Sequence, residues 1–397
     1  MTDPGLRALP TGDSPAARGA PSAVPPRPAA ALRRAAPALL GFAAVRALGV
    51  AVLAGWAAAH GKDWHTLLTA RWDSLWYTRV AEHGYGWQVR LPDGTVHSNL
   101  AFFPLLPWLE RLGAWIGPLP AADVGLVVAW TASVAAAWGI FAVAELHSGR
   151  RAAGFAVLLW AVLPVGVVQS MAYSESLFTA LAAWGLYAVL TRRWLTAGVL
   201  AALAGLTRPV GGAVVAAVWV AVVLEAVRTR RLGWRPAVGA LLAPLGAAGY
   251  VLWVGRRSGG GLLGYLDVQR QWGNGFDGGL AFARFIGSRL MSFPSVLAGA
   301  GLLAGVAGVV WLYARCVRER QPWPLLVYGG IVTVLALCAS GYFGSKPRLL
   351  LPAFPLLLPL AAALARRRPG RTAALLAGVA AASAVYGAIW LCGSGPP

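Results

Sequence analysis

Long apolar runs fill most of the chain, and about every second run is followed by a cluster of arginines. A helix needs about 20 predominantly apolar residues to cross the hydrocarbon core of a bilayer, and many of these runs approach that length. The composition agrees, because 58% of the 397 residues are hydrophobic and only 12% are charged. The sequence therefore predicts an all-α polytopic membrane protein, since helices satisfy their own backbone hydrogen bonds inside a bilayer.

The positions of the arginines decide what the net charge of +20 means. Basic clusters separate successive apolar runs, at 33–34, 150–151, 192–193, 228–235, 315–320 and 366–371. Short basic connections between spans are the positive-inside pattern, whereas a nucleic-acid-binding protein gathers its charge on one face. We therefore expect a multi-pass protein of the cell membrane with a cytoplasmic N-terminus, and no nucleic-acid partner.

The topology depends on one short apolar segment, FFPLLPWLERLGAWIG (102–117). It contains two prolines and the charged pair Glu110 and Arg111. If this segment crossed the bilayer, every later arginine cluster would fall on the outside. If it lies in the membrane interface, every cluster falls in the cytoplasm, so we predict an interfacial helix within the first outer loop.

This choice gives about eleven transmembrane helices in a single domain over 36–397, preceded by a disordered cytoplasmic tail at 1–35 that is rich in Pro, Ala, Gly and Arg. The predicted spans are 36–59, 123–146, 152–171, 174–190, 195–209, 211–227, 237–255, 292–314, 324–341, 347–365 and 371–391. The longest polar stretches, 60–122 and 256–291, are then outer loops, and any chemistry is expected there.

An acid stands between two tryptophans in RWDSLWYTRVAEHGY (71–85), where the chain leaves the first span. One interpretation is that Asp73 caps a helix over 74–83 that ends at Gly84. The other interpretation is that Asp73 is a general base, because a sugar hydroxyl attacks well only when a nearby carboxylate accepts its proton. In the second interpretation, nearby side chains bind the sugar or the acceptor: Arg71, Trp72, Trp76 and Tyr77.

The stretches 71–85 and NLAFFPLLPWLERL (99–112) resemble the opening signature of the PIG-V-like family of mannosyltransferases. That family is similar to the second mannosyltransferase of GPI-anchor synthesis and belongs to the GT-C class. Later stretches fit in the same order: AYSESLFTAL (172–181), GLTRPVGG (205–212) and SKPRLLLPAFPLLLPLA (345–361). The resemblance implies a GT-C-like fold, a polyprenyl-phosphate-linked sugar donor, and an acid in the first outer loop, which Asp73 matches by position.

Two charged residues near the ends of spans have both structural and functional interpretations. Glu175 in YSES either stabilises a helix N-terminus capped by Ser174 or binds sugar hydroxyls. Arg208 either pairs with a carboxylate such as Glu175 or binds the donor phosphate, because an unpaired arginine within a membrane is costly.

Lys346 and Arg348 stand at the outer end of the tenth predicted span. They either extend toward the interface as ordinary anchoring cations or clamp the phosphate of the leaving group. The second interpretation is favoured, because positive residues on the outer side oppose the charge rule.

The second outer loop contains GYLDVQRQWGNGFDGG (264–279). Amide and aromatic side chains suit a carbohydrate pocket, and the resemblance draws attention to Gln271 and Trp272 in this otherwise ordinary polar loop. The five histidines and three cysteines show no metal-ligand spacing, and no phosphate-binding glycine loop is present in the sequence. We therefore expect no metal and no cofactor.

These features together predict a membrane glycosyltransferase. It would move a hexose, mannose by resemblance, from a polyprenyl-phosphate donor to a lipid or glycan acceptor on the extracytoplasmic side, with inversion of the anomeric centre. Arg208, Lys346 and Arg348 would stabilise the departing phosphate. The alternative is a non-catalytic carrier or flippase of lipid-linked saccharides, which would use the same cations and aromatics without a base.

Overall fold

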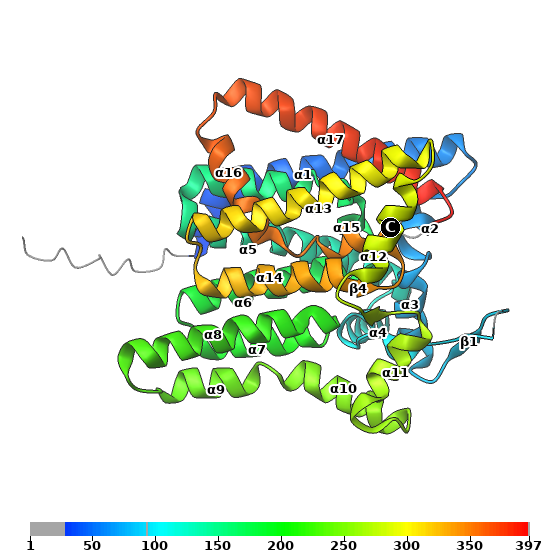
Figure 1. Cartoon of the computed structure of the whole chain (residues 1–397), viewed down its shortest axis with the longest axis horizontal. Helices are drawn as coiled ribbons and strands as arrows, with labels where there is room; N and C mark the ends of the chain where they lie inside the picture. The colour runs from blue at the N-terminus through cyan, green and yellow to red at the C-terminus, as the bar shows by residue number, and fades with distance from the viewer. Residues whose placement is uncertain (1–27, 93, 396–397) are drawn as a thin grey trace, which may run out of the picture.

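The computed structural model describes residues 28–92 and 94–395. Its long helices lie side by side, and its short helices and strands gather at one end (Figure 1). The helices of the bundle are α1 (Pro28–Ala59), α5 (Ala121–Ala161), α6 (Ser174–Leu190), α7 (Trp194–Gly205), α8 (Gly212–Thr229), α9 (Trp234–Leu242), α10 (Leu245–Arg257), α13 (Ser295–Arg318), α14 (Trp323–Cys338), α16 (Leu358–Ala365) and α17 (Pro369–Cys392). The other α-helices are α2 (Trp64–Thr69), α3 (Asp73–His83), α4 (Leu105–Ile116), α11 (Gly264–Gln271), α12 (Leu280–Leu290) and α15 (Lys346–Leu349).

Six short 3₁₀ helices and two small sheets complete the described part of the chain. The 3₁₀ helices are η1 (Asn99–Ala101), η2 (Gly166–Ser170), η3 (Pro209–Gly211), η4 (Gly261–Leu263), η5 (Phe343–Ser345) and η6 (Phe354–Leu357). The strands are β1 (Gln88–Arg90), β2 (Val96–Ser98), β3 (Gly275–Phe276) and β4 (Ala339–Ser340). Both sheets are antiparallel, with β1 paired to β2 and β3 paired to β4.

Six helical segments within 28–92 and 94–395 are long and apolar enough to cross a membrane. A seventh is added if Phe343–Leu349 and Phe354–Ala365, bent by 73°, form one span. The predicted all-α polytopic membrane protein is therefore confirmed, and the count of eleven is not. The shorter α6, α7 and α14 fall below the length that a full crossing needs. Of the predicted tail, residues 1–27 lie outside the described part, and α1 already begins at Pro28.

Helix α5 contains the predicted span 123–146 and the first half of the span 152–171, because the chain reverses within it. The first half ends near the start of α1, where Arg34 pairs with Glu145 at 3.3 Å. The second half returns along α1, and Trp160 stacks on Phe42 with ring centroids 5.4 Å apart. Gly149 stands between the halves with φ of 80°, a conformation that glycine adopts without strain.

The arginine-rich connections and the short elements lie at opposite ends of the bundle. The α8–α9, α13–α14 and α16–α17 connections are on the left of Figure 1, and α2, α3, α4 and β1 are on the right. This agrees with the predicted separation of basic turns from polar outer loops. The assignment of the basic end to the cytoplasm stays a prediction.

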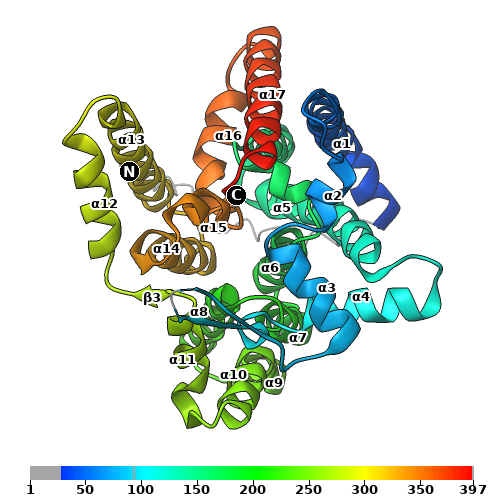
Figure 2. The same ribbon diagram turned by 90° about the vertical axis from the view of Figure 1, so that its right-hand side faces the viewer.

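The predicted interfacial segment forms α4, which at 12 residues is too short to cross a bilayer. It lies across the long helices when these are viewed end-on (Figure 2). One face exposes apolar side chains, with Trp115 83% and Ile116 70% exposed. The opposite face buries Glu110 completely. An apolar exposed face on a short transverse helix fits a position at the membrane surface.

Glu110 is a buried carboxyl with no hydrogen-bond partner among the described residues. Gly125 of α5 makes room for it, because a Cβ there would stand 2.4 Å from the Glu110 Oε1 atom. Burial, and secondarily the charge of Glu82, raises the pKa of Glu110 well above its ordinary value of 4.5. There is therefore a range of pH in which the Glu110 carboxyl is protonated in the folded protein and ionised in the unfolded chain.

This burial predicts a pH-dependent gain in stability for Glu110→Gln. Between pH 4.5 and the raised folded-state pKa, the folded protein holds a proton that the unfolded chain has lost, so stability falls as the pH rises. The neutral amide removes this loss, so the melting temperature of Glu110→Gln relative to wild type should increase with pH through that window. Asp267→Asn, which alters an exposed carboxylate paired with Arg270, is the control. If the difference in melting temperature between Glu110→Gln and wild type did not change with pH, Glu110 would not titrate in this way.

Candidate active site

Asp73 is the first residue of α3, at the end of the bundle where the short elements gather. Its Oδ2 atom accepts a hydrogen bond from Nη1 of Arg348 at 2.8 Å, and its side chain is 25% exposed. Its backbone amide donates to the Tyr173 hydroxyl at 3.2 Å. The residue at the cap position is Trp72, with φ of 50° and no side-chain cap bond. The capping interpretation of Asp73 is therefore wrong, because the carboxylate points to an arginine, whereas the predicted end of the helix at Gly84 is confirmed.

Glu175 joins the same group from α6. Its side chain is 1% exposed, and its Oε1 atom lies 2.6 Å from Nη1 of Arg208 and 3.3 Å from Nε of Arg348. The cap residue of α6 is Tyr173 rather than the predicted Ser174, and Glu175 lies in the first turn. Of the two interpretations of Arg208, its pairing with Glu175 is confirmed, and its binding of the donor phosphate stays a prediction.

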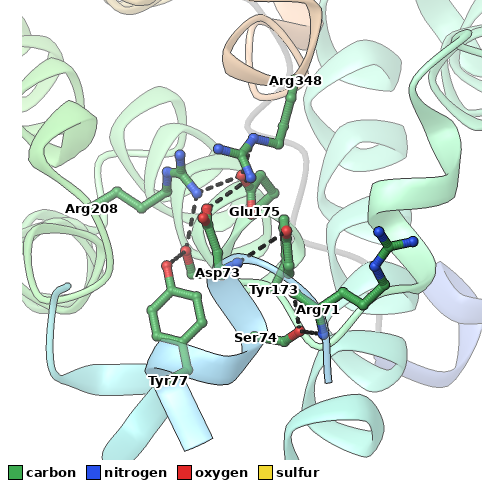
Figure 3. A network of polar contacts seen from close by, with 9 residues as sticks. Arg71, Asp73, Ser74, Tyr77, Tyr173, Glu175, Arg208 and Arg348 are labelled. Carbon is green, nitrogen blue, oxygen red and sulfur yellow. Dashed lines mark hydrogen bonds and ion pairs between the residues drawn. The ribbon is translucent and has the colours of Figure 1, made fainter. Parts of the chain in front are cut away.

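The charged cluster, defined as Asp73, Glu175, Arg208 and Arg348, draws on four separate parts of the chain (Figure 3). Arg208 lies just before η3, and Arg348 lies in α15, on the first arm of the bent segment. Taking several charges out of water costs several kcal/mol each, so such groups persist only when they compensate one another. Two acids and two guanidiniums achieve this balance and leave no net charge.

A hydroxyl pair extends the charged cluster. Ser174 Oγ lies 2.7 Å from the Tyr77 hydroxyl and accepts a hydrogen bond from Arg208 at 3.1 Å. Burial raises the pKa of Tyr77, so the phenol keeps its proton. Tyr77 was predicted as a site residue because it is close to Asp73 in the sequence, but Tyr173 and Ser174 were not predicted as site residues. Their only signal was their place in AYSES beside Glu175.

Aromatic side chains from α3 and both predicted outer loops pack against one another. Trp76 stacks on Phe102 at 5.4 Å and meets Trp272 edge-on at 4.7 Å, and His97 stacks on Trp272 at 4.2 Å. The predicted residues Trp76, Tyr77 and Trp272 are thus brought close together. Trp272 also donates from Nε1 to the carbonyl of Ser98, which ties the second predicted loop to the first.

Two cavities meet at the charged cluster. A cleft of about 370 Å³ is lined by Asp73, Tyr77 and Trp272, and a second cavity of about 690 Å³ has mainly apolar walls from α11, α14 and β3. Arg208 and Arg348 line both cavities. The arrangement therefore places guanidinium groups between a polar cleft that contains a carboxylate and an apolar chamber of lipid-tail character.

Gln269, not Gln271, is the glutamine that reaches these cavities. Gln269 lines both cavities and donates to the Tyr265 hydroxyl at 2.7 Å, whereas Gln271 is exposed and lines neither. The period of α11 explains the difference, because Tyr265, Gln269 and Trp272 share one face of a helix and Gln271 does not. A helical assignment of this loop would have singled out Gln269 from the sequence.

Lys346 lies beside the cleft but directs its amine toward α14. Its Nζ atom donates to the carbonyls of Ala336 at 2.9 Å, Leu337 at 3.3 Å and Ala339 at 2.7 Å. These are carbonyls at the C-terminal end of α14, where a cation is favourable. All three ammonium protons therefore have partners, and binding of a donor phosphate by Lys346 stays a prediction that would require it to exchange them.

Arg71 and Trp72 point away from the charged cluster. Arg71 donates to the carbonyls of Leu391 at 2.6 Å and Gly393 at 3.1 Å, and its guanidinium lies 4.0 Å from the Trp72 ring centroid. Figure 3 shows this side chain on the far side of Tyr173 from Arg348. Arg71 thus fastens the end of α17 to the start of α3.

We expect Arg71→Gln to weaken the contact between the end of α17 and the start of α3. Hydrogen bonds from charged donors contribute about 1.5–3 kcal/mol, and a glutamine cannot reach both carbonyls. The variant should lower the melting temperature by several degrees and increase protease cleavage near the end of α17. Arg79→Gln is the control, because Arg79 is an exposed arginine in the adjoining helix α3 and lies over the Trp87 ring. Equal effects of the two substitutions would contradict the role given to Arg71.

The described residues contain no group of three or more His, Cys, Asp or Glu side chains that could hold a metal ion. The charged cluster itself offers two carboxylates and two guanidiniums. A carboxylate can accept a proton from a hydroxyl, and guanidiniums can bind phosphate oxygens in pairs.

The helical bundle and the transverse α4 define an all-α polytopic membrane protein. No protein-family model and no curated protein matches the sequence. Among solved structures, the chain is similar to the apo oligosaccharyltransferase of Archaeoglobus fulgidus, with a TM-score of 0.50, 15% identity, and coverage of 90% of this chain and 56% of that one. It is also similar to ArnT of Cupriavidus metallidurans bound to undecaprenyl phosphate, with a TM-score of 0.48, 16% identity, and coverage of 88% and 63%.

The chain thus spans less than two thirds of the length of either protein. At this identity the likeness to the archaeal enzyme shows a shared fold. The predicted GT-C-like fold is confirmed, and membership of the PIG-V-like family stays a prediction.

Proposed function

We propose that this protein is a membrane glycosyltransferase that moves a hexose from a polyprenyl-phosphate donor to a lipid or glycan acceptor. The observation that carries this proposal is the junction of two cavities at Arg208 and Arg348, with the Asp73 carboxylate on the polar side. The protein with the shared fold is an oligosaccharyltransferase, so the fold is compatible with sugar transfer. Mannose as the sugar follows from the resemblance of 71–85 and 99–112 to the PIG-V-like family.

In this proposal the donor lies across the junction of the two cavities. Its prenyl tail occupies the apolar chamber of about 690 Å³, and its phosphate binds Arg208 and Arg348. Its sugar projects into the cleft that Trp272 and Tyr77 line, where aromatic faces suit sugar rings. Positive groups fixed at the phosphate stabilise the charge that develops as the glycosidic bond breaks.

Arg348 would connect donor binding to activation of the acceptor. Its guanidinium now contacts both Asp73 and Glu175. A donor phosphate that engages Arg348 competes with the Asp73 carboxylate for the same donor groups, so Asp73 is released to an acceptor hydroxyl. The hydroxyl oxygen then attacks the anomeric carbon as Asp73 takes its proton, and attack opposite to the phosphate inverts that centre.

The experiment supplies membranes containing the protein with labelled mannosyl-phosphate polyprenol, and follows the label into glycolipid and polymer fractions. We expect transfer from the lipid-linked sugar and none from nucleotide-linked mannose. The corresponding glucosyl donor tests the choice of sugar. Movement of intact donor across the bilayer without any new glycosidic bond would replace the enzyme with a carrier or flippase.

A further inference from the structure

A second apolar cavity lies at the end of the bundle opposite to the charged cluster. It has a volume of about 730 Å³ and lies between α1, the second half of α5 and α17. In Figure 1, α1 and α17 converge at their C-terminal ends and diverge toward their N-terminal ends, and the lining residues come from those diverging halves. We call this space the wedge cavity, with walls that include Gly41, Phe155, Leu158, Leu376 and Ala377.

Three arginines also line the wedge cavity, and some of their guanidinium N–H groups have no hydrogen-bond partner among the described residues. Arg34 pairs with Glu145, but its Nε atom is buried without a hydrogen-bond partner. Arg151 donates from Nη2 to the carbonyl of Arg367 at 2.9 Å, which leaves its other donors free. Arg150 has no hydrogen-bond or ion-pair partner within 28–92 and 94–395. The site therefore carries excess positive charge with donors available to an anion.

Because the chain reverses at Gly149, Arg150 and Arg151 lie at the rim of the wedge cavity. The second half of α5 starts directly after this glycine, so Arg150 and Arg151 stand in its first turn. Phe155 and Leu158 follow Arg151 on the same face, at spacings of four and seven residues. One helix face thus presents guanidinium groups at the rim and apolar side chains deeper in the cavity, which is the pattern of an amphiphile with an anionic head.

We propose that the wedge cavity binds an anionic glycerophospholipid of the bilayer. Arginines at the boundary of a membrane protein bind lipid phosphates, and their paired donors fit phosphate oxygens. A cavity of this size holds much of an acyl chain. The described lining contains no carboxylate to receive the cationic part of a zwitterionic headgroup. This inference depends on charge and shape at the basic end, and is independent of the proposed sugar transfer.

The test is native mass spectrometry of the full chain released from micelles that contain equal amounts of phosphatidylglycerol and phosphatidylcholine with identical acyl chains. We expect preferential retention of phosphatidylglycerol, and about a tenfold loss of that preference in Arg150→Gln/Arg151→Gln. The matched control is Arg231→Gln/Arg318→Gln, which removes two exposed charges from other connections at the same end. Ala377→Trp fills the wedge cavity without changing charge, and should lower retention of the same lipid.

Three outcomes would overturn the proposal. Equal retention of the two lipids would exclude selective recognition of an anion. Equal loss in the matched control would assign the effect to general surface charge. Displacement of phosphatidylglycerol by an equimolar polyprenyl phosphate, but not by an equimolar fatty acid, would assign the wedge cavity to a prenyl lipid instead. Glycerol 3-phosphate, which has the charge without a chain, is expected not to compete.

Discussion

Replacing Asp73 with asparagine is expected to lower the rate of sugar transfer by about 10²–10⁴-fold, the range that general acid–base groups contribute. Asparagine is nearly isosteric with aspartate and can still accept a hydrogen bond from Arg348. It cannot remove a proton from an attacking hydroxyl. The substitution therefore separates the chemical role of Asp73 from the shape of its surroundings.

The measurement compares transfer of labelled sugar with retention of labelled donor in the same membranes. Donor retention should change by less than about threefold, because Arg208 and Arg348 keep the positive charge at the proposed phosphate position. Glu82→Gln is the matched control, since Glu82 is an exposed carboxylate on the same helix. Unchanged transfer in Asp73→Asn would remove Asp73 from the mechanism, and loss of both transfer and donor binding would show a binding role instead.

Loss of a partner of Arg348 could also loosen the folded protein, so stability must be followed in parallel. Arg348 keeps its contact with Glu175 at 3.3 Å, and the Asp73 side chain is partly exposed. We therefore expect Asp73→Asn to cost far less stability than a change within the buried part of the charged cluster. A melting temperature close to that of wild type would attribute lost transfer to lost chemistry.

The sequence was sufficient to predict the class of fold because the controlling forces act along the chain. Apolar length and the positions of arginines depend on local composition, and both determine which segments enter a bilayer. The helix α3 and its end before Gly84, the short helix within 102–117 and the separation of basic turns from polar loops follow from the same local rules. The number of full crossings does not follow from these rules, because packing allows α6, α7 and α14 to be shorter than a free-standing span.

The site was only partly predictable, for reasons that concern tertiary contacts. The pairing of Arg208 with Glu175 could be inferred from the cost of an unpaired charge in a membrane. The contact between Arg348 and Asp73 joins positions 275 residues apart, and no local pattern indicates it. Arg71 was misleading because adjacency in sequence to Asp73 does not direct its side chain, which turns to the end of α17.

The second large effect concerns stability: Glu175→Gln is expected to lower the free energy of unfolding by about 3–5 kcal/mol. Glu175 is almost fully buried and lies 2.6 Å from Arg208, so the substitution leaves a guanidinium without its compensating charge. The measurement is denaturation in mild detergent, followed through tryptophan fluorescence. Glu319→Gln is the control, because it alters a more exposed Arg315–Glu319 pair within one turn of helix and should cost less than about 1 kcal/mol.

A double substitution then distinguishes a structural from a functional reason for this pair. Replacing a buried ion pair with apolar residues of similar size is often neutral or stabilising, so Glu175→Leu/Arg208→Met should recover most of the stability that Glu175→Gln loses. Sugar transfer should remain absent, because the proposed phosphate site has lost Arg208. A protein that regains stability without regaining transfer would show that the pair is kept for its chemistry. If transfer returned with stability, Arg208 would have no part in the reaction and the pair would serve only to join α6 to the turn before η3.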